Sequence, residues 1–178
     1  MIRRHWAAAL LLAAVAFGCG NSDVLMINDF ETARDLDCLK WRCHYWLEQT
    51  TEFATSGAHG LKMEFPAGEY PTVELWKVPR DWRGYTWFEA DLWAPDLQGE
   101  TLMIRIDDRG DATAFADRFE LAVPLTGAPQ HVRVPLDRIA RGNGGRPQNL
   151  GAMRRILFYF GRTDRRVTLY LDGVKLTR

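Results

Sequence analysis

The chain has 178 residues, 47% of them hydrophobic, and its 23 basic side chains balance 23 acidic ones at zero formal charge. This balance gives no electrostatic reason to expect nucleic acid or an anionic membrane surface as a partner. The length and composition suit one folded domain with a sizeable core.

The first eighteen residues have the pattern of a secretory signal. Arg3 and Arg4 precede an apolar run over 7–17, which is shorter than the roughly 20 residues of a transmembrane helix. We therefore expect a signal peptide over 1–18, a tether over 19–23 and one domain over 24–178. Without the two signal arginines, 21 basic side chains face 23 acidic ones.

Gly18-Cys19 closes this run and resembles the lipobox of bacterial lipoproteins, in which the cysteine becomes lipidated. Gly20 after the cysteine resembles outer-membrane sorting in Gram-negative bacteria. We expect an exported protein that is lipid-anchored through Cys19 at the outer membrane, in the periplasm or at the cell surface. Ordinary signal cleavage, leaving a free protein, is the alternative.

Two further cysteines, Cys38 and Cys43, stand close together. Outside the cytoplasm such a pair more often forms a disulfide than stays reduced. A metal site that also uses His44 is the alternative, although no further ligand stands nearby. We predict the disulfide.

From Val24 onward the dominant hydrophobic period is two, which is typical of half-buried strands. In the segment 86–94, for example, Phe88, Ala90 and Leu92 fall on one side. Strands are predicted at 24–31, 46–54, 60–65, 72–78, 86–94, 102–107, 118–123, 131–134, 156–160 and 167–171. This spacing predicts an all-β fold, an antiparallel β-sandwich or jelly roll. Helical turns are expected only near 136–140 and 150–154.

Several short motifs carry a family resemblance. They are Asn28-Asp29-Phe30-Glu31, the turn 56–63, Asp81-Trp82-Arg83-Gly84-Tyr85, Ile104-Arg105-Ile106-Asp107-Asp108 and the closing 168–176. Together they resemble the galactose-binding-like jelly-roll domains that serve as non-catalytic carbohydrate-binding modules beside agarases and other glycoside hydrolases. A similar fold occurs in the intermediate-associated assembly proteins of respiratory complex I. The resemblance implies a poly- or oligosaccharide ligand, or alternatively a protein partner.

Aromatic and charged side chains that share the polar side of their strands suit a sugar ligand. Sugars stack their CH faces on aromatic rings and bridge their hydroxyls to charged groups. The predicted ligand-binding residues are Trp76, Trp87, Glu89, Asp91, Trp93, Arg105, Asp107, Arg118, Glu120 and Tyr159. We expect them to line one shared sheet face. Burial of the tryptophans under loops is the alternative.

One pair of carboxylates in this sequence could indicate catalysis. Glu89 and Asp91 fall on one strand face, as in part of the Glu-x-Asp-x-x-Glu strand of laminarinase-type glycoside hydrolases, but Ala94 stands at the third position. Pairing of both acids with Arg105 and Arg118 is the alternative. No serine elbow and no zinc motif is found, so we expect no enzyme.

The same resemblance implies a structural calcium site. Domains of this kind often hold Ca²⁺ between acidic residues of the first and last strands and the carbonyls of a turn. Here Asp29, Glu31 and Asp172 stand in matching places, with the turn 56–60 between them. Hard oxygen ligands of this kind suit calcium. The alternative is that these acids only terminate turns.

Overall fold

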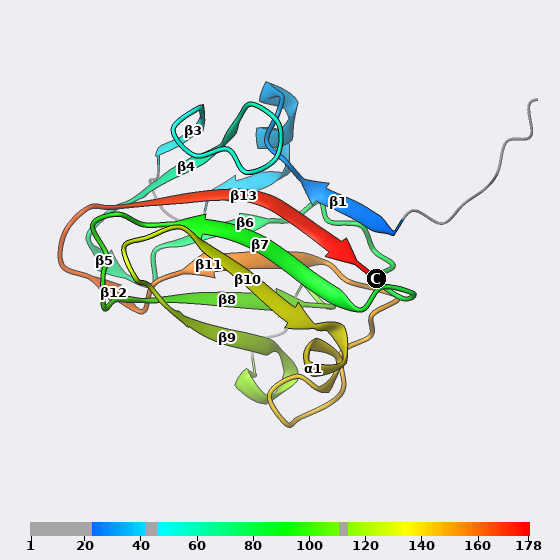
Figure 1. The fold of residues 1–178 in the computed structure, drawn as a ribbon. Coiled ribbons are helices and arrows are strands. Elements are labelled where there is room, and N and C mark those ends of the chain that lie inside the picture. The colour runs from blue at the N-terminus through cyan, green and yellow to red at the C-terminus, as the bar shows by residue number, and fades with distance from the viewer. Residues whose placement is uncertain (1–22, 42–45, 111–113) are drawn as a thin grey trace, which may run out of the picture.

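The fold is built from two antiparallel sheets packed face to face (Figure 1). It was obtained as a computed structural model that describes residues 23–41, 46–110 and 114–178. The six-stranded sheet contains β1 (Val24–Asn28), β3 (Trp46–Thr50), β4 (Gly60–Phe65), β7 (Trp87–Trp93), β10 (Gln130–Pro135) and β13 (Val167–Thr177). The five-stranded sheet, in the order β2-β6-β11-β8-β9, contains β2 (Leu39–Trp41), β6 (Thr72–Leu75), β8 (Thr101–Asp107), β9 (Phe119–Pro124) and β11 (Arg155–Tyr159).

Smaller elements close the two ends of the sandwich. The two-residue strands β5 (Gly68–Glu69) and β12 (Arg162–Thr163) pair at the end opposite α1 (Leu136–Arg141) (Figure 1). Two 3₁₀ helices, η1 (Ala33–Cys38) and η2 (Phe115–Asp117), precede β2 and β9. The predicted sandwich is therefore confirmed.

The long strand β13 organises the six-stranded sheet. It pairs with β7 along one side, and with β4 and then β1 along the other. Val24 of β1 lies opposite Thr177, so the two ends of the described domain lie side by side. The prediction of a strand over 167–171 was too short, because the alternation resumes after Gly173.

The core lies between the sheets and follows the period-two pattern. Phe88, Ala90 and Leu92 of β7 are fully buried, and so are Leu102, Ile104 and Ile106 of β8. Burial of such side chains contributes about 25 cal/mol for each Å² of apolar surface removed from water. Trp82 is also fully buried, and it stacks on Phe88 with ring centroids 5.9 Å apart.

The helical predictions are partly correct. The turn expected near 136–140 is α1, but 150–154 forms only a turn and a bend. The 3₁₀ helix η1 was not predicted. Asp35 fixes its start by accepting the Thr32 N–H at 2.7 Å, the second half of a capping box. No helix of the described residues is long and apolar enough to cross a membrane.

Candidate functional site

The predicted ligand residues lie on two opposite outer faces, not on one. Trp87, Glu89, Asp91 and Trp93 belong to β7 and lie on the outer face of the six-stranded sheet. The others lie on or directly beside the outer face of the five-stranded sheet: Trp76, Arg105, Asp107, Arg118, Glu120 and Tyr159. The expectation of one shared face was wrong. The alternation shows on which side of its strand a side chain lies, but it does not show to which sheet the strand belongs.

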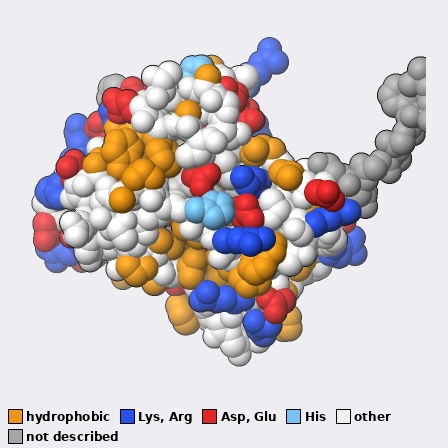
Figure 2. All heavy atoms as spheres, in the orientation of Figure 1, with side chains coloured by type: hydrophobic (Ala, Val, Ile, Leu, Met, Phe, Trp, Pro, Cys, Tyr) orange, Lys and Arg blue, Asp and Glu red, His pale blue; other side chains and the backbone are white. Residues whose placement is uncertain are grey.

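On the six-stranded face both β7 carboxylates are paired. Arg133 Nε lies 3.0 Å from Glu89 Oε1, and His131 Nδ1 lies 2.7 Å from Asp91 Oδ1. Figure 2 looks onto this face and shows a histidine among acidic and basic side chains, beside a hydrophobic area. The expected partners Arg105 and Arg118 belong to the other sheet, so that pairing was wrong.

The indoles of this face are also engaged. Trp93 stacks on Tyr170 at 4.9 Å, and its Nε1–H donates to the Gly127 carbonyl at 3.1 Å. The Arg133 guanidinium lies 4.0 Å from the centre of the Trp87 ring. One face of each ring is therefore covered by a neighbouring protein group.

On the outer side of the five-stranded sheet, a layer of charged side chains pairs around Asp107. This fully buried carboxylate accepts hydrogen bonds from Arg105 Nε at 3.0 Å and from Arg155 Nε at 2.8 Å. Arg155 also lies 3.9 Å from Glu74 of the neighbouring strand. Charges of alternating sign thus cross β6, β11 and β8, and such mutual hydrogen bonds hold each side chain in one orientation.

A second group of polar side chains continues this layer towards β9. The Tyr159 hydroxyl donates to Glu120 Oε1 at 2.9 Å. Burial raises the pKa of Tyr159, and this hydrogen bond raises it further, so the hydroxyl keeps its proton at neutral pH. Arg118 Nε lies 2.8 Å from the same oxygen, but its N–H does not point at it, so that contact is an ion pair without a hydrogen bond.

Exposed aromatic rings stand at both sides of this layer. Trp76, directly after β6, is 39% exposed, with Lys40 Nζ and Lys77 Nζ 4.6 and 4.9 Å from its ring centre. Phe115 of η2 is 59% exposed beside Arg118. Since β6 and β9 are three strand spacings apart, about 14 Å separates these strands. We name this surface the five-stranded face: Trp76, Arg105, Phe115, Arg118, Glu120 and Tyr159, with the buried Asp107 and Arg155 beneath them.

Phe115 and Arg155 were missed at the level of sequence. Arg155 could have been predicted, because it lies two and four residues before Leu157 and Tyr159 in β11 and so points to the same face of the sheet. Phe115 lies in a 3₁₀ turn, where no period applies, and so no sequence signal identified it.

The predicted calcium ligands meet the turn through N–H groups. Asp172 Oδ2 accepts the Thr55 and Ser56 N–H groups, the latter at 2.8 Å, and Glu31 Oε1 accepts those of Ala58 and His59 at 2.8 Å each. Asp29 lies half-buried in the loop after β1. Among the described residues no group of three acidic, histidine or cysteine side chains could hold a metal. These two carboxylates accept N–H groups of the turn, and the calcium site stays a prediction.

The cysteine predictions fall largely outside the described residues. Cys19, Cys43 and His44 lie there, so lipidation and the Cys38–Cys43 disulfide stay predictions. Cys38 itself is a buried thiol whose sulfur accepts the Asn28 amide at 2.8 Å. Burial raises the pKa of this thiol.

Known proteins resemble this chain in their structure but not in their sequence. No protein-family model and no curated protein matches the sequence. The family 11 carbohydrate-binding module from Clostridium thermocellum, solved with a β-1,3-1,4-mixed-linked tetrasaccharide, has a TM-score of 0.65 at 11% identity, over 86% of this chain and 95% of that one. A family 22 module from the same organism has a TM-score of 0.54 at 12% identity, over 89% and 96%.

An agarase domain has the same architecture. An exo-β-agarase has a TM-score of 0.61 at 14% identity, over 85% of this chain but 24% of the enzyme. The chain is thus structurally similar to carbohydrate-binding modules and to a domain of agarases, as its motifs predicted.

Proposed function

We propose that this chain is a non-catalytic carbohydrate-binding protein that holds an extended oligo- or polysaccharide across the five-stranded face. The observation that carries the proposal is the layer of mutually paired charges between Trp76 and Phe115. A structural neighbour that was solved with a tetrasaccharide supports the ligand class.

The chemistry of this face suits sugar hydroxyls. Arginine guanidiniums donate hydrogen bonds, Glu120 accepts them, and the Tyr159 hydroxyl can do both. Their mutual pairing reduces the conformational entropy that is lost on binding. The exposed rings at the two sides offer apolar surface to the CH faces of the sugars.

We also propose that Glu89 and Asp91 have no catalytic role. A retaining glycosidase needs a nucleophile and an acid about 5 Å apart. Here Glu89 and Asp91 are instead engaged with Arg133 and His131. Reducing-end release from a polysaccharide mixture that is lost in Glu89→Gln would contradict this part.

Isothermal titration against soluble mixed-linkage β-glucan, xylan and agarose oligosaccharides tests the binding. We expect at least one to bind, and Tyr159→Phe to weaken it by about three- to tenfold, because one hydrogen bond is lost. Trp76→Ala should weaken it by a similar factor or more through lost ring contact.

The matched control is Trp87→Ala, an indole on the opposite face of the same domain. Its affinity should equal that of the unsubstituted chain, with all variants showing the same thermal melting curve. Flat titrations for every polysaccharide would sink the proposal and favour a protein-interaction domain. A loss of affinity in Trp87→Ala alone would indicate that the site lies on the outer face of the six-stranded sheet.

We further propose export and lipid anchoring at Cys19, on the strength of the Gly18-Cys19 junction. Labelling with radioactive palmitate in a Gram-negative host should mark the unsubstituted chain and not Cys19→Ala. Equal labelling of both would exclude this attachment site.

A further inference from the structure

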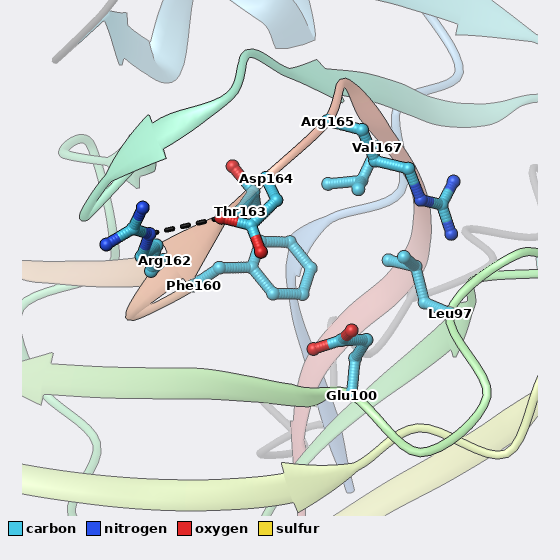
Figure 3. Close-up of a pocket in the computed structure, with 8 residues that line it drawn as sticks. All are labelled: Leu97, Glu100, Phe160, Arg162, Thr163, Asp164, Arg165 and Val167. Carbon is cyan, nitrogen blue, oxygen red and sulfur yellow. Dashed lines mark hydrogen bonds and ion pairs between the residues drawn. The ribbon is translucent and has the colours of Figure 1, made fainter.

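A cavity of about 410 Å³ opens at the end of the sandwich where β12 pairs with β5, and no predicted ligand residue lines it. Its floor is apolar and well packed. Phe160 and Leu97 are 2% exposed, and Val167 is buried beside them. In Figure 3 the Phe160 ring lies in the middle of the lining, with Leu97 and Val167 on one side.

The rim carries hydrogen-bonding groups of both kinds. Arg162 and Arg165 supply guanidinium donors, and Glu100 and Asp164 supply carboxylate acceptors. Arg162 Nε lies 3.1 Å from Asp164 Oδ1, while Arg165 donates to the Asp96 carbonyl at 2.8 Å. Within the described part of the chain no side chain pairs with the Glu100 carboxylate, which leaves it available to a ligand.

Backbone and side-chain hydrogen bonds hold the walls in place. The Glu100 N–H donates to the Leu97 carbonyl at 3.1 Å, and the Leu125 N–H donates to the Glu100 carbonyl at 2.8 Å. Across the opening, the Thr163 hydroxyl donates to the Pro66 carbonyl at 2.7 Å. The backbone of the two lining segments, 97–100 and 160–167, is therefore held in place before any ligand arrives, and each segment connects one sheet to the other.

We infer that this pocket binds a single neutral sugar residue, at a chain end or a side branch of the glycan. The volume lies in the lower half of the range for small-molecule sites, which suits one ring better than an extended chain. The few pocket-facing atoms of the otherwise buried Phe160, Leu97 and Val167 would contact CH groups of that ring. The two arginines and two carboxylates leave no net charge at the rim, so neither an acidic nor a basic sugar is favoured.

This inference rests on the proposed glycan-binding function, and it assigns a second contact on a different surface of the domain. It is tested with D-glucose, D-galactose, D-xylose and L-arabinose as probes and the purified chain, using saturation-transfer NMR followed by titration. We expect saturation transfer to at least one of the four sugars. The double variant Glu100→Ala/Arg162→Ala should bind that sugar at least tenfold more weakly.

Asp164→Trp provides a second variant, because this 86%-exposed side chain can be enlarged at the mouth without touching the core. It should also abolish the transfer, whereas Trp87→Ala, on the outer face of the six-stranded sheet and outside both proposed sites, should leave it intact. Urea unfolding midpoints equal to that of the unsubstituted chain would verify that all variants fold.

The two proposals fail in different ways. Absence of transfer from all four sugars, or full affinity in the double variant, overturns the pocket even if polysaccharides still bind at the five-stranded face. A monosaccharide signal that the pocket variants abolish, in a chain whose polysaccharide titrations are flat, supports the pocket and overturns the extended site.

Discussion

At the residue scale, Asp108 holds the loop beside the five-stranded face in place. Its carboxylate is 3% exposed and accepts two hydrogen bonds from Arg146, at 2.6 and 2.7 Å, and the Asn149 N–H at 2.7 Å. Burial acts to raise the pKa of Asp108, but the bonds from Arg146 and Asn149 outweigh it and hold this pKa below its usual value.

This pair makes stability depend on pH in a defined direction. Because the pKa of Asp108 is lower in the folded state, its contribution is complete above the unfolded pKa of about 3.9 and is lost as the pH falls through the folded value. We expect Asp108→Asn to lower the free energy of unfolding by about 2–3 kcal/mol at neutral pH, since Arg146 loses its charged partner. The difference should narrow below about pH 4.

Urea unfolding of the unsubstituted chain and of Asp108→Asn, at neutral pH and below about pH 4, measures this difference in the free energy of unfolding. Asp137→Asn is the matched control, because Asp137 pairs with Arg141 in the open, where both side chains are more than two-thirds exposed. Such exposed pairs contribute at most about 0.5 kcal/mol. Equal losses in the two variants would contradict the role given to Asp108.

At the element scale, β13 depends on a bulge at Gly173. The register of its pairing with β7 shifts between Asp172 and Lys175, and Gly173 has a φ of 57°. At this point β13 exchanges its neighbour β4 for β1. A Cβ at Gly173 would lie only 2.8 Å from Asp91 Oδ2. The left-handed backbone therefore favours glycine here, and a Cβ would also displace the Asp91 carboxylate from its contacts with Thr55 and His131.

Gly173→Ala should consequently lower the free energy of unfolding by more than the roughly 1 kcal/mol that a left-handed backbone alone costs alanine. Gly84→Ala is the control, because Gly84 also has a positive φ, of 85°, but a Cβ at this position would meet no atom within 4 Å. Chemical denaturation of both variants separates the two causes. Equal losses would show that the approach of Asp91 does not matter.

At the scale of the whole molecule, the acidic residues Glu31 and Asp172 decide whether calcium stabilises the fold. Glu31 and Asp172 are satisfied by N–H groups of the turn 55–59. We expect the thermal melting temperature to be the same in EGTA and in millimolar calcium, because these donors already occupy the carboxylates. A melting temperature several degrees higher in calcium would establish the predicted site instead.

Much of the fold could be predicted from the sequence, but only part of the candidate site could. Buried and exposed sides of β7 and β8 agree with the alternation, because each is a single strand with one face towards the core. The partners of Glu89 were mispredicted, since they depend on β10 and β13 lying beside β7. Phe115 and the pocket around Phe160 depend on loops, where no period exists.

The alternation of side chains by itself determined an antiparallel sandwich and the buried side of most strands, because a period of two is a property of one extended segment. Only the tertiary structure decided that Trp76 and Tyr159 belong to one sheet and Trp87 and Trp93 to the other. Strand pairing joins segments that are distant along the chain, and the convergence of side chains into a face or a pocket depends on that pairing.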